Sequence, residues 1–277
     1  MEIKPVIKRI TIYPIKSLDG ISLSKAKVVD GGCLEHDREY AIVDDNGKFV
    51  NCKSNVLVHM LRSDINFEDE VIFFRHELEP TWNQFHLQND ETAINKFLSS
   101  FFKMKVSLHK SPEGKFLDIP VKSGVTALST ASLETVAGWF KNIKLEEARK
   151  RFRATLEISG VPAFWEDRLF YQKGIAVEFK IGEVLLYGLS PRARCVVPSR
   201  HPKNGETIHA FQKSFALQRA ANLPNWSPLN NYNHAYYLSV DCYLPKTEFG
   251  KRINTGDEIT ITGKRYQLTN IPFSPVF

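Results

Sequence analysis

Short apolar segments separated by turn residues run through roughly the first 75 residues. They read VIKRITIYPI, ISLSKAKVV, EYAIVDDNGKFV, VLVHMLRSDINF and EVIFF. The clusters DG, DGG and NFEDE separate them, and Asp45, Asn46 and Gly47 have the composition of a tight hairpin turn. Apolar runs this short, bounded by turns, predict antiparallel strands. We therefore expect the N-terminal part of the chain to be rich in β-structure.

The hydrophobic period changes after Asp90. Apolar residues from Ile94 to Phe102 recur every three or four positions, which predicts a helix over about 91–103. A loop through SPEGKFLDIPVKSG follows and marks the join to a second half of the chain. The stretch ALSTASLETVAGWF then predicts a helix capped by Ser129 or Thr130, and LEEARKRFR predicts a shorter one.

The remainder returns to the pattern of strands. The apolar segments there are ATLEISG, DRLFYQKGIAVEF, EVLLYGL, HAYYLSVDCYL, DEITI and KRYQLT. Between them, residues 201–233 are polar and rich in Pro and Asn, and we expect helical turns and a long surface loop. The sequence therefore predicts a mixed, mostly β protein of the α+β class.

Composition adds few constraints. A chain of 277 residues with 43% hydrophobic and 25% charged residues can bury one large or two modest cores. The formal charge of +6 suits an anionic partner but does not choose one. The N-terminus lacks the pattern of a secretion signal, and no stretch reaches the length of a membrane span. We expect a soluble, cytoplasmic protein without a transmembrane segment.

Basic and hydroxyl residues collect at the ends of predicted elements. Lys16 and Ser17 stand where an apolar strand stops, and Arg38 directly precedes another strand. Arg153 lies at a helix-to-strand junction, and Ser129 at a helix N-terminus whose free amides favour an anion. Each position is also common in ordinary turns and caps, so each alone is a weak signal of a binding site.

The stretch SPRARCVV places a cysteine in a cationic setting. Cys195 follows Arg192 and Arg194 and precedes Val196 and Val197. Neighbouring cations favour a thiolate, which is either a nucleophile or a metal ligand. The other three cysteines, at positions 33, 52 and 242, form no paired motif, so neither a zinc site nor an iron–sulfur cluster is indicated.

Four ordered stretches carry a resemblance to a known family. They are YPIKSLDGISLSKAKVVDGGCLEHDREYAIVDDNGKFV, RFRATLEISGVPAFWEDRL, ARCVVPSRHPKNGE and INTGDEITI. Together they resemble the MOSC superfamily, whose members include the mitochondrial amidoxime-reducing component and its bacterial relatives. The resemblance implies an N-terminal β-barrel-like subdomain over 1–122, which includes the helix near 91–103. It also implies a C-terminal MOSC β-barrel with flanking helices over 123–277, and a cofactor in the cleft between the two.

The resemblance further implies a molybdenum cofactor, a pyranopterin whose phosphate is held by basic and hydroxyl groups. By position, Cys195 would be the metal ligand and the catalytic residue. The matching candidates for cofactor contacts are Lys16, Ser17, Arg38, Ser129, Arg153, Thr155, Ala193 and Arg194. Three positions depart from the family pattern. Thr155 stands where Asn is usual, Ala193 where Ser is usual, and Arg200-His201-Pro202 where Asp commonly precedes Pro.

The function implied is reduction of N-hydroxylated compounds, such as amidoximes and hydroxylamines, to amines. The chain shows neither a four-cysteine ferredoxin pattern nor a GxGxxG fingerprint. We therefore expect no pyridoxal phosphate, iron–sulfur cluster or flavin in this chain, and electrons from a separate flavin reductase, ferredoxin-like or cytochrome b5-like protein. Two alternatives stay open: a sulfur carrier with a persulfide on Cys195, and a non-catalytic anion-binding relative. No signature of specific nucleic-acid recognition is present.

Overall fold

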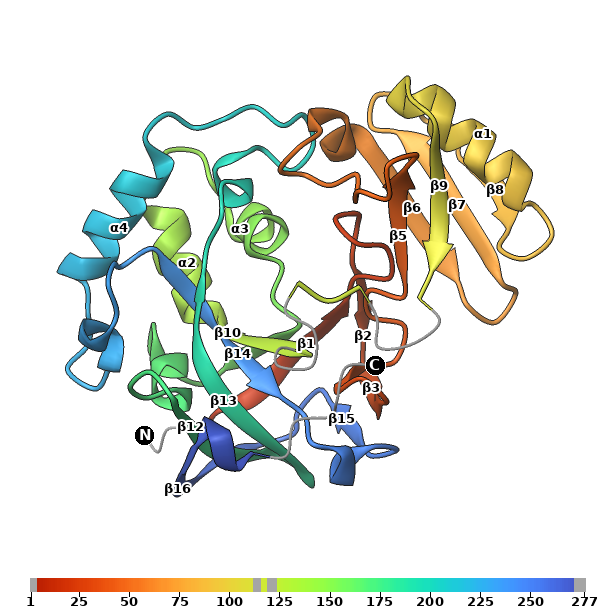
Figure 1. Cartoon of the computed structure of the whole chain (residues 1–277). Coiled ribbons are helices and arrows are strands. Elements are labelled where there is room, and N and C mark those ends of the chain that lie inside the picture. Colours follow the sequence, from red (N-terminus) through yellow and green to blue (C-terminus); the bar gives the residue numbers. More distant parts are fainter. Residues whose placement is uncertain (1–3, 112–115, 119–123, 272–277) are drawn as a thin grey trace.

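The computed structural model describes residues 4–111, 116–118 and 124–271. Strands dominate this part of the chain, and four helices accompany them (Figure 1). The helices are α1 Glu91–Phe102, α2 Thr130–Gly138, α3 Leu145–Phe152 and α4 Phe211–Ala221. The α+β, mostly β class expected from the sequence is confirmed.

Eight strands form the largest sheet, in the order β16-β12-β13-β14-β10-β11-β1-β2. Their bounds are β1 Val6–Ile12, β2 Ile21–Leu23, β10 Val125–Ser129, β11 Leu156–Ser159, β12 Ile175–Ile181, β13 Val184–Ala193, β14 Tyr237–Tyr243 and β16 Ile259–Gln267. Every neighbouring pair is antiparallel except β10 with β11. The helix α2 and the helix α3 connect these two parallel strands, as a crossover between parallel strands requires.

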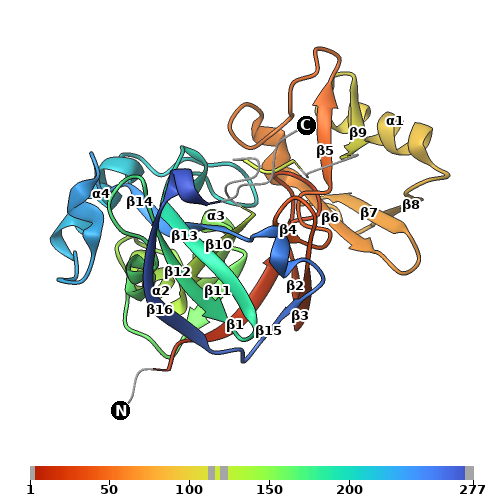
Figure 2. The same cartoon turned by 60° about the horizontal axis from the view of Figure 1, so that its bottom comes forward.

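The large sheet curls toward a barrel (Figure 2). β1 meets the start of β16 through an isolated antiparallel bridge between Val6 and Glu258. The Ile7 amide also donates to the Asp257 carbonyl oxygen at 2.9 Å. The barrel expected here is therefore incomplete: among the described strands, one bridge and a few turn contacts stand where a closed barrel would have a full ladder.

Three smaller sheets are formed mainly by strands of the first half of the chain. The first sheet has the strand order β15-β3-β4, the second consists of β5 and β9, and the third has the order β6-β7-β8. Their bounds are β3 Lys25–Val29, β4 Cys33–Leu34, β5 Tyr40–Asp44, β6 Leu61–Asn66, β7 Val71–His76, β8 Asn83–His86, β9 Val106–Lys110 and β15 Arg252–Asn254. Because β1 pairs with β11 and β3 pairs with β15, both from the second half of the chain, the two halves interlock at their edges. The boundary at residue 122 stays a prediction.

Local signals explain most of the helices. The side chain of Ser129 accepts from the Ser132 amide at the start of α2, so the predicted cap is confirmed. α1 also begins where expected, but Asp90 does not cap it, because its carboxylate accepts instead from the His86 amide at 2.8 Å. No helix in the described part of the chain is both long and apolar enough to cross a membrane.

The helix α4 was not predicted, because its segment is polar and was expected to form helical turns and a loop. Phe211 and Phe215, four residues apart, are buried in a core that α2 and α3 share. One turn further on, Arg219 is 1% exposed, forms an ion pair with Asp167 and lies 3.8 Å from the centroid of the Phe164 ring. A buried arginine therefore takes the place of a third apolar residue in this helix.

Two buried carboxylates follow one another in a 3-10 turn over Trp165–Leu169. Asp167 forms the ion pair with Arg219 and accepts a hydrogen bond from the Ser227 hydroxyl. Glu166 is 1% exposed. Burial, with a further contribution from the neighbouring charge of Asp167, raises the pKa of Glu166 to about 7.

We predict that Glu166→Gln changes how stability depends on pH. The folded-state pKa of Glu166 lies above the unfolded value, so its contribution to the free energy of unfolding falls as pH rises from about 4.5 to about 7. Relative to wild type, Glu166→Gln should gain roughly 2–3 kcal/mol between pH 5 and pH 8. Urea unfolding at both pH values measures this difference, and a difference that does not change with pH would contradict the assignment.

Candidate functional site

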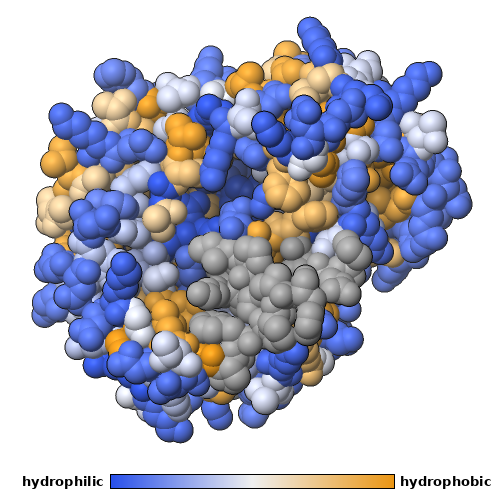
Figure 3. All heavy atoms as spheres, in the orientation of Figure 1, coloured by the Kyte–Doolittle hydropathy of each residue, from blue (hydrophilic) through white to orange (hydrophobic). Residues whose placement is uncertain are grey.

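A cavity of about 340 Å³ opens where the two halves of the chain meet. Its lining residues come from positions 9–82 on one side and 128–203 on the other. On the face shown in Figure 3, a hollow lined by hydrophilic residues opens near the middle of the molecule. The sequence had implied a site in the cleft between two subdomains, and the cavity lies at that junction.

Cationic side chains outnumber carboxylates in the cavity wall. The cations are Arg9, Arg62, Arg75, Arg149, Lys150, Arg151, Arg153, Arg200 and Lys203. The carboxylates are Asp19, Glu77, Glu146 and Glu157. Ion pairs with carboxylates of the described residues engage Arg9, Arg62, Arg149, Arg151 and Lys203. Arg75, Lys150, Arg153 and Arg200 form no such pair within the described part of the chain, so the cavity favours an anion.

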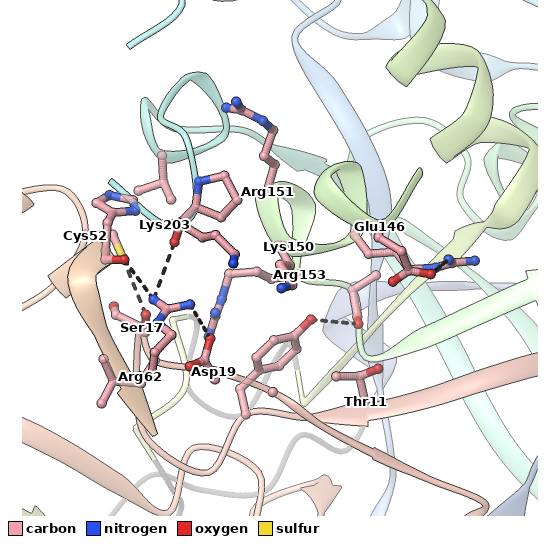
Figure 4. Close-up of a pocket in the computed structure, with 18 of the residues that line it drawn as sticks. Thr11, Ser17, Asp19, Cys52, Arg62, Glu146, Lys150, Arg151, Arg153 and Lys203 are labelled. Carbon is pink, nitrogen blue, oxygen red and sulfur yellow. Dashed lines mark hydrogen bonds and ion pairs between the residues drawn. The ribbon is translucent and has the colours of Figure 1, made fainter. Parts of the chain in front are cut away.

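Arg153 occupies the central position in this wall (Figure 4). It ends α3 in a left-handed conformation, with φ of 50°, and its guanidinium carbon lies 4.0 Å from the centroid of the Tyr13 ring. Burial lowers the pKa of Arg153. Among the described residues, no hydrogen bond or ion pair engages its guanidinium. A desolvated cation without a partner is costly in a folded protein unless a ligand neutralises it.

Arg38 also lies against Tyr13, with its guanidinium carbon 4.6 Å from the ring centroid. It differs from Arg153 in being neutralised: its Nη1 donates to both oxygens of Asp37, at 2.6 and 2.5 Å. Asp37 is fully buried and also accepts from the Tyr13 amide at 2.7 Å. The structure therefore brings the predicted pair Arg38 and Arg153 together around one ring, and Asp37 fixes that ring in place.

Lys16 and Ser17 follow β1, as the sequence predicted. Lys16 does not line the cavity, because its Nζ forms an ion pair with Asp118 at 2.7 Å and donates to the Phe116 carbonyl oxygen. Ser17 does line the cavity, and its φ of 73° is unusual for a residue other than glycine. Its carbonyl oxygen accepts from the Cys52 thiol at 3.4 Å. The turn thus directs one hydroxyl residue toward the cavity and one lysine away from it.

Cys195 is partly exposed and follows the end of β13. Its carbonyl oxygen accepts from the Tyr236 hydroxyl at 3.0 Å, which fixes the backbone at this position. Cys195 is absent from the cavity wall, but Val197, two residues further on, contributes to it. The thiol also lies near the cavity residue Cys52, since a charge on Cys195 raises the pKa of the Cys52 thiol in addition to the effect of burial.

The two arginines before Cys195 have different partners. Arg194 donates from Nη2 to the Phe152 carbonyl oxygen at 2.7 Å, and its Nε is buried without a partner in the described residues. Burial, and then the charge of Arg192, lowers the pKa of Arg194 to about 10. Arg192 was expected to favour the thiolate form of Cys195, but it forms ion pairs with Asp118 and Asp241. Arg194 is therefore the cation that stays available beside the cysteine.

Of the predicted site residues, only Ser17 and Arg153 line the cavity, and the three that remain to be placed also lie outside its wall. Ser129 is fully buried as the cap of α2. Thr155 is 1% exposed, and its hydroxyl oxygen accepts from the Thr126 amide at 3.0 Å. Ala193 is exposed at the end of β13. The proposed roles of these residues in holding a cofactor stay predictions.

Arg200, which departs from the family pattern, lines the cavity, and so does His59, which the sequence analysis did not name. The Arg200 guanidinium donates to the Cys52 carbonyl oxygen at 2.5 Å and so joins the two sides of the cavity. His59 is 4% exposed, and burial, reinforced by Arg200 and Arg62, lowers its pKa to about 4. His59 is therefore neutral at pH 7. The departure from the family pattern at Arg200 therefore lies at the cavity, near the site that the resemblance implies.

The residues present fit a phosphate-bearing cofactor that also takes a thiolate ligand. Arg153 supplies an unpartnered cation, the Arg194 Nε supplies an unpartnered donor, and Cys195 supplies a partly exposed sulfur. Guanidinium groups bind phosphate through charge-assisted hydrogen bonds, and a thiolate suits a thiophilic metal. The arrangement can hold an anion and a metal on the same side of the molecule.

Taken together, the curled sheet and the cation-rich cavity near a strand-end cysteine describe a mostly β protein with a pocket at the junction of its two halves. The chain belongs to the MOSC domain family: residues 4–143 match the MOSC N-terminal beta barrel domain, and residues 108–260 match the MOSC domain. The resemblance found in the sequence is confirmed.

Two curated relatives align with part of the chain. The molybdenum cofactor sulfurase of Bombyx mori is 33% identical over 72 residues, which make up 26% of this chain and 9% of that protein. Molybdenum cofactor sulfurase 3 of Aedes aegypti is 30% identical over 87 residues, 31% of this chain and 11% of that protein. Among solved structures, the YuaD protein of Bacillus subtilis aligns with a TM-score of 0.38 at 11% identity, covering 92% of this chain and 94% of that one.

We predict that Arg153→Met abolishes most phosphate binding without harming the fold. Losing a charged hydrogen-bond donor should raise the Kd of inorganic phosphate roughly tenfold or more, measured by isothermal titration calorimetry. The unfolding midpoint without phosphate should stay equal or rise by a few degrees, because a desolvated cation is removed. Arg265→Gln is the control, since Arg265 lies over Tyr171, outside the cavity. Unchanged phosphate affinity in Arg153→Met would refute the role of Arg153.

Proposed function

We propose that this protein binds a molybdenum cofactor and reduces N-hydroxylated compounds, such as amidoximes and hydroxylamines, with electrons from a separate protein. The observation that carries the proposal is the unpartnered guanidinium of Arg153 in a cationic cavity beside Cys195. Membership of the MOSC family, and the likeness to proteins named molybdenum cofactor sulfurases, support the choice of cofactor.

The residues would divide the task of holding the cofactor. Arg153 and the Nε of Arg194 would bind the pterin phosphate, and the thiolate of Cys195 would bind the metal. Ser17 would offer a hydroxyl from the opposite side of the cavity. Arg38, whose charge Asp37 neutralises, would position the Tyr13 ring and through it Arg153.

The reaction breaks the N–O bond of the substrate, consumes two electrons and two protons, and releases the amine and water. When bound, the molybdenum cofactor would supply the two-electron chemistry of this reduction. Val197, which lines the cavity, would help to exclude bulk water from the bound substrate. Because the sequence carries no pattern for a second redox group, the electrons would come from a flavin reductase, a ferredoxin-like protein or a cytochrome b5-like protein.

We predict about one molybdenum per chain in protein purified from a host that synthesises the cofactor. Cys195→Ala should lose most of the metal or release it on gel filtration, whereas Cys242→Ala should keep it, because Cys242 is fully buried in the core of the large sheet. Plasma mass spectrometry measures the metal content, and benzamidoxime reduction with an artificial donor measures turnover. A well-folded wild type without molybdenum would refute the reductase.

A persulfide carrier is the second candidate, and the names of the curated relatives favour it. In this reading Cys195 receives a sulfur atom from a separate desulfurase and passes it to an acceptor. Wild-type protein should then release thiocyanate on treatment with cyanide, and Cys195→Ala should release none. Sulfane sulfur without molybdenum would favour the carrier, and molybdenum without sulfane sulfur would favour the reductase.

A further inference from the structure

One exposed aromatic residue belongs to the cavity wall. Trp82 is 42% exposed, and among the large apolar residues that the described chain exposes to this degree, it alone lines the cavity. The Arg75 guanidinium carbon lies 4.9 Å from the centroid of its ring. An indole with a cation over it and open surface beside it is suited to stack a flat ring.

Arg75 is held in place by backbone carbonyl oxygens rather than by an ion pair with a described carboxylate. Its Nη1 donates to the carbonyl oxygens of His76, Glu77 and Glu79, at 3.2, 3.1 and 3.0 Å. Nε and Nη2 have no hydrogen-bond partner among the described residues, and no described carboxylate forms an ion pair with this side chain. Three carbonyl contacts orient a guanidinium so that its remaining donors can bind an anion.

The charge of the cavity also restricts the substrate. Nine cationic side chains stand in the wall against four carboxylates, so a protonated amidine or amine is repelled. Arg153 is committed to the cofactor in the proposed function, which leaves Arg75, Lys150 and Arg200 as cations without a described carboxylate. A second anionic group, carried by the substrate, would find partners there.

We infer that the part of the cavity formed by Trp82 and Arg75 selects a substrate that combines a flat aromatic ring with an anionic group, for which AMP serves as the probe. The inference rests on the proposed function, because it names the substrate class of the same site. The ring stacks on Trp82, and the anionic group binds Arg75 and its cationic neighbours. Stacking on an aromatic side chain tolerates different rings, so we expect the anionic group to influence substrate affinity more than the identity of the ring does.

Titration calorimetry with AMP, adenosine and inorganic phosphate tests this inference on the protein as purified. AMP should bind at least tenfold more tightly than either adenosine or phosphate. Trp82→Ala should weaken AMP roughly tenfold and leave phosphate unchanged, and Trp82→Phe should restore affinity to within about threefold. Arg75→Gln should weaken AMP roughly tenfold, while the matched control Arg265→Gln should not.

Two results would overturn the inference: AMP that binds no better than phosphate, or AMP affinity unchanged in Trp82→Ala. The latter would mean that AMP occupies only the phosphate site at Arg153. Cys195→Ala separates the two proposals, because it should lose the metal and keep its affinity for AMP. Molybdenum present without a preference for AMP refutes the substrate class alone. AMP binding as predicted, in a protein that holds no molybdenum, refutes the reductase alone.

Discussion

The site depends on one cation without a hydrogen-bond or ion-pair partner among the described residues, the guanidinium of Arg153, held against the Tyr13 ring where the two halves of the chain meet. The left-handed end of α3 places it there, and the buried pair of Asp37 and Arg38 fixes the ring from the other half. Partial burial without an ion-pair partner in the described residues makes this cation less favourable in the protein alone, and the same property suits it to bind a phosphate. An anionic ligand bound to Arg153 would remove this cost.

The contacts between the two halves of the chain form the cavity in which Arg153 lies. β1 and β2 extend the sheet built by the second half, so the turn that carries Ser17 follows directly from a strand paired with β11. Arg200 reaches across to the carbonyl oxygen of Cys52 and closes the same junction from the other direction. A cavity built at such a junction has walls fixed by two hydrophobic cores, which suits a ligand that needs several separate contacts.

The sequence predicted the elements better than the contacts. Strand ends and the cap of α2 follow from local chemistry, so Ser17, Arg153 and Ser129 were placed correctly along the chain. The position of Arg153 in the sequence could not show that it lacks a carboxylate partner, whereas the partner of Arg38 is the preceding residue, Asp37. Tyr13 and Trp82 gave no local signal, because their roles arise from partners that tertiary packing supplies. The helix α4 was missed because one of its buried positions is Arg219, whose partner Asp167 lies 52 residues away.

A crystal structure of protein purified from a cofactor-synthesising host, with anomalous data collected at the molybdenum edge, tests the central claim most directly. The account predicts an anomalous peak at bonding distance from the Cys195 sulfur and a phosphate group on the guanidinium of Arg153. A structure with no molybdenum and an additional sulfur atom on Cys195, or with the metal held elsewhere and Arg153 still unpartnered, would contradict it.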